Sequence, residues 1–249
     1  MEIEFKKEKQ IAVITLNRPE VLNAINAELS SQLNDALVQV KDDPEIWVAI
    51  ITGAGDRAFS AGADIRGFQP GPRAAAAPRL RIDQIWKPFI AAIHGFCLGG
   101  GLEMALTCDL RIAANNARFG LPEIKVGIIP AGGGMSRLPR FIPRAKAAEM
   151  LLTGQFIDAA EAYRVGLVNT VVPREELMPT AMRWATTICE AGPLQIRAVK
   201  EVMLRGYNMP LDDSLKLERE ISNGIRQTED FVEGTRAFVE KRKPQWKGR

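Results

Sequence analysis

Apolar and polar positions alternate over the first sixteen residues, and the period then changes. Two short apolar runs within residues 3–16 flank the charged stretch KKEKQ, which predicts two strands joined by a turn. Asn17-Arg18-Pro19 ends the second strand, because proline lacks the backbone donor that a ladder needs. From Asn26 to Val40 an apolar residue recurs every three or four positions. This spacing predicts a helix with Asn26 as its N-cap.

Continuous apolar runs follow. Residues 46–52 and 88–95 are almost wholly apolar, as in strands that are covered on both faces. The glycine-rich residues 53–64 predict a loop between them. Residues 102–108 suit a buried helix, and residues 109–114 suit a strand after it. The order of strand, helix, strand, helix and strand indicates a layered α/β domain.

Helical patterns dominate after Ala131. Helices are predicted over 144–154, 158–166, 175–192 and 194–206, a strand over 167–172, and an amphipathic charged region over 211–243. A boundary near 190–200 divides the chain into a core, residues 1–195, and a helical C-terminal region, residues 196–249. That region would pack on the core or on a neighbouring subunit. The Ala- and Pro-rich residues 71–79 predict a loop or a helix start.

The composition is that of an ordinary globular protein. The 249 residues are 46% apolar and 25% charged. A net charge of +3 is too small to indicate a nucleic-acid or anionic-membrane partner. The single histidine, His94, excludes a metal site with several histidines and argues against a Ser-His-Asp triad. Three scattered cysteines lack metal-ligand and disulfide spacing, which favours a reducing compartment.

Targeting and membrane segments are not expected. The N-terminal residues mix charges with apolar positions and lack the apolar core of a signal peptide. Residues 88–108 are long enough to span a membrane, but they contain a glycine triplet and Glu103 and lack basic flanks. We therefore predict a cytoplasmic protein without a membrane or nucleic-acid partner.

Two glycine-rich stretches could approach a ligand. Residues 53–58 spell G-x-G-x-x-A after a predicted strand, but no helix follows and no ribose-binding acid lies about twenty residues on, which disfavours a dinucleotide site. In the stretch AFSAGADI, Gly62 lets the backbone approach a ligand closely. If a helix starts near Asp64, the Ala63 amide lies near its positive end. The structural alternative is a turn capped by Asp64.

Two glutamates are the candidate acid–base groups. The triplet Gly99–Gly101 precedes a predicted helix whose exposed amides could stabilise negative charge on an oxygen, and Glu103 lies in its first turn. Glu123 lies just after Pro122, before a second glycine triplet. Two carboxylates beside glycine-rich backbone suggest paired acid–base chemistry. The structural alternatives are a capping role for Glu103 and a surface ion pair for Glu123 with Lys125 or an arginine.

These motifs together resemble the crotonase superfamily, the family of enoyl-CoA hydratases and isomerases. The resemblance spans the chain through VITLNRPEVLNAIN, GAGDRAFSAGADI, KPFIAAIHGFCLGGGLEMALTCDLRIA, ARFGLPEIKVGIIPAGGGMSRLPR and AFVEKRK. It implies an α/β fold of the ClpP/crotonase type, a spiral of repeated ββα turns with a helical C-terminal trimerisation region. It also implies an acyl-CoA substrate, no metal or separate cofactor, and a homotrimer or a hexamer of two trimers.

The resemblance also implies roles for individual residues. Two backbone amides polarise the thioester carbonyl in this family, and the matching positions are Ala63 and Gly100. Hydratases of the family carry two glutamates, matched here by Glu103 and Glu123. Glu103 would hold and deprotonate the water that attacks C3 of a trans-2-enoyl thioester. Glu123 would deliver the proton to C2 and help to orient the water.

Other family positions imply contacts with the substrate. They match the backbone at the adenine, a basic contact with the CoA phosphates, an aromatic near the acyl group, and a lysine that often reaches the nucleotide of an adjacent subunit. The expected substrate-binding residues are Ala61, Asp64, Ile65, Arg66, Ala131, Phe238 and Lys241. The chain departs from the family pattern at PAGGG, where hydratases commonly have P-G-A-G-G, so Ala131 replaces a glycine near the water site.

Alternative functions remain open at this point. The same fold could support Δ3-Δ2-enoyl-CoA isomerisation or hydration of a specialised acyl-CoA such as crotonobetainyl-CoA, although the glutamate pair favours simple hydration. A non-catalytic RNA-binding relative should have a long lysine-rich face, which the small net charge argues against. An NAD-dependent oxidoreductase would need the dinucleotide site disfavoured above.

Overall fold

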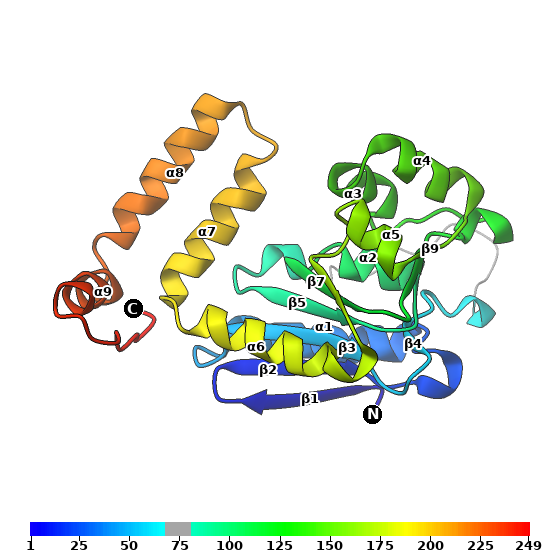
Figure 1. Ribbon diagram of the computed structural model, residues 1–249, viewed down its shortest axis with the longest axis horizontal. Helices are drawn as coiled ribbons and strands as arrows, with labels where there is room; N and C mark the ends of the chain where they lie inside the picture. Colours follow the sequence, from blue (N-terminus) through cyan, green and yellow to red (C-terminus); the bar gives the residue numbers. More distant parts are fainter. Residues whose placement is uncertain (68–80) are drawn as a thin grey trace.

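Two β-sheets form the framework of the protein (Figure 1). The computed structural model describes residues 1–67 and 81–249. The larger sheet has the order β1-β2-β3-β5-β7-β10, and the smaller sheet has the order β4-β6-β8-β9. The strands are β1 Ile3–Glu8, β2 Ile11–Leu16, β3 Val48–Gly53, β4 Ala58–Ser60, β5 Phe89–Ile93, β6 Phe96–Leu98, β7 Leu110–Ala114, β8 Arg118–Gly120, β9 Ile157–Asp158 and β10 Thr170–Val172.

From β3 to β8, consecutive strands alternate between the two sheets and produce stacked turns. In the larger sheet β3, β5 and β7 are parallel neighbours. The strands that follow each of them along the chain, β4, β6 and β8, are parallel neighbours in the smaller sheet. Helical segments complete the turns, including α2 (Gly100–Ala105) after β6 and α3 (Gly134–Phe141) after β8. This repeat confirms the predicted spiral of ββα turns.

Two apolar clusters hold the layers together. One joins a face of the larger sheet to the smaller sheet and to α1 (Ala27–Asp42), and it includes the fully buried Phe59, Phe89 and Phe119. The other fills the space between the opposite face and α6 (Leu177–Cys189). Because β3 and β5 are covered on both faces, every residue in each of them is buried, as their continuous apolar sequences predicted.

The remaining helices lie in two places. α4 (Arg144–Thr153) and α5 (Ala159–Arg164) lie beside α3, whereas α7 (Pro193–Gly206), α8 (Leu211–Ile225) and α9 (Glu229–Val239) extend from the opposite side of the molecule (Figure 1). The domain boundary predicted at residue 195 falls in the first turn of α7 and stays a prediction. Among the described helices, none is long and apolar enough to cross a membrane.

Several local predictions were wrong. The loop predicted over 53–64 contains β4, a strand of three buried residues that pairs with β6. The helix predicted over 102–108 begins at Gly100 and ends at Ala105, so two residues of the glycine triplet lie in its first turn. The strand predicted over 167–172 is confined to β10. The prediction for residues 71–79 lies outside the described residues.

Candidate active site

Three segments that leave the smaller sheet at one edge form the candidate site. β4, β6 and β8 run parallel, so the residues after their carboxyl ends lie close together. β4 leads to Ala63, β6 leads to Gly100 and Glu103, and β8 leads to Glu123. The fold therefore brings together the four residues on which the catalytic prediction depends.

Two backbone amides lie close together where α2 begins. A Cβ on Gly62 would lie 3.0 Å from the Gly100 nitrogen, and a Cβ on Gly100 would lie 3.6 Å from the Ala63 nitrogen. Gly62 and Gly99 have φ angles of +93° and +50°, which glycine adopts without strain. Neither the Ala63 nor the Gly100 amide donates to an acceptor in the described part of the chain. Two neighbouring unpaired donors can stabilise an oxygen that gains negative charge.

A short parallel contact holds the Ala63 segment. The Ile25 amide donates to the Gly62 carbonyl at 2.7 Å, and the Asp64 amide donates to the Ile25 carbonyl at 2.9 Å. Ile25 thus bonds the residues on both sides of Ala63. In a parallel pairing the residue between two such bonds turns its own amide away from the partner. The Ala63 amide therefore faces away from Ile25 and stays available.

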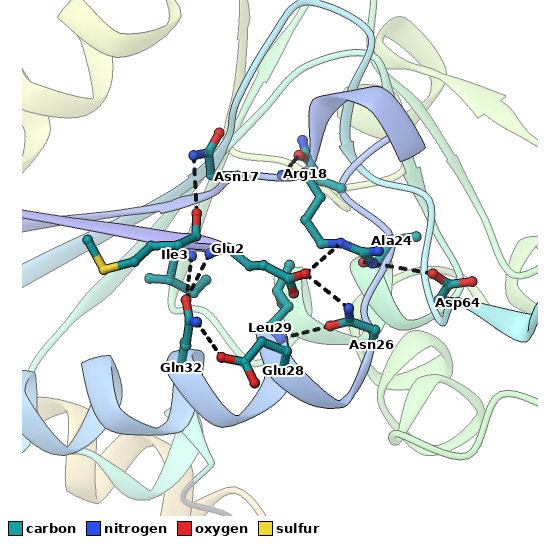
Figure 2. A network of polar contacts seen from close by, with 12 residues as sticks. Glu2, Ile3, Asn17, Arg18, Ala24, Asn26, Glu28, Leu29, Gln32 and Asp64 are labelled. Carbon is teal, nitrogen blue, oxygen red and sulfur yellow. Dashed lines mark hydrogen bonds and ion pairs between the residues drawn. The ribbon is translucent and has the colours of Figure 1, made fainter. Parts of the chain in front are cut away.

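A polar network around Arg18 fixes the end of this segment (Figure 2). Arg18 Nη1 donates to the Ala24 carbonyl at 2.6 Å and to Asp64 Oδ2 at 3.3 Å, and its Nε pairs with Glu2 Oε1 at 3.1 Å. Arg66 donates to both oxygens of Asp64, at 2.8 and 2.7 Å. The hydrogen bonds from Arg66 and Arg18 hold the pKa of Asp64 well below its ordinary value.

Glu103 is almost completely buried, and the main chain holds one of its oxygens. Glu103 is only 8% exposed. Its Oε1 accepts hydrogen bonds from the amides of Gly132 and Gly134, at 2.7 and 2.8 Å. A Cβ on Gly132 would lie 2.4 Å from Oε2, so this close approach requires a glycine there. No described residue donates to Oε2, which leaves that oxygen available to a water molecule.

Glu123 begins a short 3-10 helix, Glu123–Val126, directly after Pro122. Its Oε2 is buried and has no hydrogen-bond partner among the described residues. Burial raises the pKa of Glu123, and the negative charge of Glu103 raises it further. A raised pKa makes a carboxyl a better candidate for a general acid. The alternative of a surface ion pair is wrong, since no described lysine or arginine pairs with Glu123 and its Oε2 is buried without a partner.

The other predicted substrate-binding residues divide into two groups. Ala61, Asp64, Ile65 and Arg66 lie on the segment that carries Ala63, and Ala131 directly precedes the glycines that bind Glu103. The second group, Phe238 and Lys241, is not brought to Glu103 within the chain. Phe238 is 85% exposed near the end of α9, and Figure 1 shows α9 on the side of the molecule away from α2 and α3.

Sequence reasoning missed the groups that hold Glu103. It associated the second glycine triplet with Glu123, whereas Gly132 and Gly134 donate to Glu103. It also missed Arg137, which donates to the Gly132 carbonyl at 3.1 Å. The available signal was an arginine one helical turn after a glycine triplet. That signal does not tell which distant side chain the exposed amides will meet.

His94 lies beside the start of β4, whereas the site follows the end of that strand. Its backbone carbonyl accepts from the Phe59 amide at 2.7 Å. The side chain is fully buried, and neither ring nitrogen has a hydrogen-bond partner among the described residues. Burial, together with the charge of Arg174, lowers the pKa of His94 to about 4.

Within residues 1–67 and 81–249, no group of three histidine, cysteine or acidic side chains lies close enough together to hold a metal ion.

The chain is similar to known proteins over its whole length. The family model for enoyl-CoA hydratase/isomerase matches residues 6–249. An (E)-benzylidenesuccinyl-CoA hydratase from Thauera aromatica is 42% identical over 255 residues, covering 100% of both chains. The crotonyl-CoA hydratase of Syntrophomonas wolfei is also 42% identical, covering 97% of this chain and 96% of its own. The crystal structure of an enoyl-CoA hydratase from Mycobacterium tuberculosis H37Rv superposes with a TM-score of 0.94 at 37% identity, covering 100% of this chain and 99% of that one.

Proposed function

We propose that this chain, which belongs to the enoyl-CoA hydratase/isomerase family, adds water reversibly to short-chain trans-2-enoyl-CoA thioesters and forms 3-hydroxyacyl-CoA. One observation carries the proposal. Two carboxylates, Glu103 and Glu123, lie beside the unpaired amides of Ala63 and Gly100. Hydration needs this combination, because a carbonyl must be polarised while one proton leaves water and another reaches carbon.

The two amides would bind the thioester carbonyl. In the proposal the Ala63 and Gly100 amides donate hydrogen bonds to the thioester oxygen. When water attacks C3, negative charge moves through the conjugated double bond to that oxygen. Donors placed where the charge develops stabilise the transition state more than the ground state. Removing one such donor typically costs about 10²–10³ in rate.

The two carboxylates divide the proton transfers. Glu103 Oε1 is occupied by two amides, so Oε2 would accept the proton of the attacking water. Glu123, whose pKa is raised by burial and by the charge of Glu103, would deliver a proton to C2. The hydroxyl thus joins C3 and the hydrogen joins C2. Because both carboxylates act from one side of the substrate, the addition is syn. In dehydration the same groups exchange roles.

This chemistry requires neither a metal nor a redox cofactor. Addition of water leaves the overall oxidation state of the substrate unchanged, and the carboxylates move the protons. Coenzyme A enters as part of the substrate. Arg66 lies exposed beside the Ala63 segment, where it would contact the CoA phosphates. The composition supports a cytoplasmic location.

We further propose that the working form is a homotrimer or a hexamer of two trimers. α7, α8 and α9 extend away from the sheets, and α9, which contains Phe238 and ends just before Lys241, lies on the side of the molecule away from α2, which contains Glu103 (Figure 1). In the assembly, Phe238 would border the acyl group bound by a neighbouring copy, and Lys241 would approach its nucleotide. Light scattering on the purified protein measures the molar mass of the assembly, and the mass of a monomer would contradict the proposed trimer or hexamer.

A bulkier or more specialised acyl group is the second candidate substrate. It is favoured by the relative from Thauera aromatica, which matches over the whole chain and whose name specifies benzylidenesuccinyl-CoA. The same carboxylates and amides would serve, and only the acyl pocket would differ. The substrate panel must therefore include benzylidenesuccinyl-CoA and crotonobetainyl-CoA beside straight-chain, branched and 3-enoyl substrates.

The test follows the loss of enoyl-thioester absorbance with crotonyl-CoA. Wild type should turn over rapidly, whereas Glu103→Gln and Glu123→Gln should each lose at least about 10²–10⁴ in kcat. Glu8→Gln, at an exposed position of β1, is the matched control and should keep wild-type rates. Thermal melting shows whether the variants are folded. Absence of turnover on every member of the panel would refute hydration.

A further inference from the structure

Asp83 and Arg137 form an ion pair behind the loop that binds Glu103. Arg137 Nη2 lies 2.6 Å from Asp83 Oδ2, and the two side chains are only 21% and 19% exposed. Arg81 donates to the other oxygen of Asp83 at 2.9 Å. Burial, the largest single influence, opposes the charge of Asp83, but the hydrogen bonds and charges of Arg137 and Arg81 together outweigh it and lower the pKa of Asp83. Asp83 is therefore ionised near neutral pH.

Arg137 also contacts the main chain of the loop. Its Nη1 donates to the Gly132 carbonyl at 3.1 Å. A Cβ on Gly133 would lie 1.9 Å from the same nitrogen, so the guanidinium lies directly over that glycine. Gly133 has a φ angle of +107°, a conformation that glycine adopts without strain. The peptide between Gly132 and Gly133 is thus fixed by a charged, pre-oriented donor.

That peptide is the middle one of three. The amide of Gly132 belongs to the peptide before it, and the amide of Gly134 belongs to the peptide after it. Both amides donate to Glu103 Oε1. A rotation of the middle peptide would therefore displace both donors together. The side-chain hydrogen bonds of Arg137 go to the Gly132 carbonyl and to Asp83 and none goes to Glu103 among the described residues, so we expect Arg137 to act through the loop.

Asp83 supplies the fixed point for this arrangement. It lies in a 3-10 turn, Ile82–Gln84, between Ile82 and Ile85, which are 3% and 2% exposed. These buried neighbours anchor the backbone of the turn. An anchored carboxylate holds a guanidinium in one orientation better than water does, because its hydrogen bond is charge-assisted.

We propose that Asp83 and Arg137 are positioning residues for hydration. Asp83 orients Arg137, and Arg137 fixes the loop whose amides hold Glu103, so that Oε2 faces the attacking water. The inference rests on the proposed function. Loss of the pair leaves substrate binding intact but loosens the base, so it lowers kcat more than it changes KM. Amide donors favour the ionised carboxylate, so their loss also moves the acidic limb of the kcat profile to higher pH.

The test compares wild type with Arg137→Met, Arg137→Lys and Asp83→Asn in crotonyl-CoA hydration across pH. Arg137→Met should lower kcat about 10- to 10²-fold with KM within about threefold, since small misplacements of catalytic groups cost this much. Arg137→Lys keeps the charge and should recover part of the loss. Asp83→Asn, which is nearly isosteric, should act in the same direction. Arg140→Met, an exposed arginine on the same helix, is the matched control.

A second measurement does not depend on turnover. Hydrogen–deuterium exchange of peptides covering residues 129–138 reports whether the amides of Gly132 and Gly134 are held. Arg137→Met should exchange there about tenfold faster than wild type or Arg140→Met, because its loop opens more readily.

The two measurements separate the possible failures. Wild-type kcat, pH profile and exchange in Arg137→Met would overturn the proposal. If that variant does not fold, Asp83→Asn decides the question by the same measurements. If wild type does not hydrate crotonyl-CoA, the proposed function fails, and the exchange result alone then supports or overturns the role of the ion pair in holding the loop.

Discussion

Protonation of His94 should destabilise the fold at mildly acidic pH. The ring is fully buried without a hydrogen-bond partner among the described residues, and its pKa falls from 6.5 to about 4. The unfolded chain therefore binds the proton before the folded chain does. Stability that depends on the neutral ring is complete above pH 6.5 and is lost as the pH falls from 6.5 toward 4. Among the groups that face His94, Arg174 also lowers its pKa, whereas the backbone of Gly55 and the charge of Asp56 raise it without offsetting burial.

The magnitude follows from the two pKa values. Their difference corresponds to about 3 kcal/mol in total, of which about 2 kcal/mol is lost between pH 8 and pH 5. This is a large part of the stability of a typical domain. Since the chain has a single histidine, no other imidazole contributes in this window.

Urea denaturation at a fixed protein concentration between pH 8 and pH 5 measures this effect. His94→Met keeps the volume nearly constant and cannot titrate, so its free energy of unfolding should fall by about 2 kcal/mol less than that of wild type over this range. Glu123, whose raised pKa acts in the opposite direction, contributes equally to both proteins and cancels in the comparison. Parallel pH curves for wild type and His94→Met would refute the reasoning.

Three further substitutions have defined outcomes. Gly132→Ala should lower kcat by at least about 10²-fold without unfolding the protein, because its Cβ would lie 2.4 Å from Glu103 Oε2; steady-state kinetics with a circular-dichroism control measure this. Gly224→Ala, in α8 with open space around it, should leave kcat unchanged and stabilise the protein by about 0.5–1 kcal/mol in thermal melts. Lys200→Met should destabilise by about 3–5 kcal/mol in urea, because Lys200 pairs with Asp109 at 2.7 Å in the interior; a loss below about 1 kcal/mol would contradict the importance of this pair.

Local chemistry made much of the fold predictable. Asn26 caps α1 by accepting a hydrogen bond from the Leu29 amide at 2.8 Å, as its residue type and position indicated. The continuous apolar runs of β3 and β5 indicated burial on both faces. β6 and β8 were missed because three residues cannot display a period. Their pairing across the smaller sheet, and not their own sequences, determines that they form strands.

The site was predictable where the residues that act together lie close to one another in the sequence. The glycines beside Glu103 and the AFSAGADI stretch indicated exposed amides near a carboxylate. The partner of the second glycine triplet was not predictable, because 29 residues separate Gly132 from Glu103 and only the stacking of turns brings them together. The ion pair of Asp83 with Arg137 spans 54 positions and has no periodic signal at all.

The two halves of the site differ in how they tolerate mutation. The donors proposed for the thioester are main-chain groups, so any residue except proline at position 63 still carries the amide. At Gly100 a Cβ would keep the amide and would lie 3.6 Å from the Ala63 nitrogen, an ordinary contact distance, so the amide there does not depend on the side chain either. The proton-transfer half depends on two side chains, each of which a single substitution removes. Variation can therefore change the reaction performed on a bound thioester while the means of binding and polarising it are inherited unchanged.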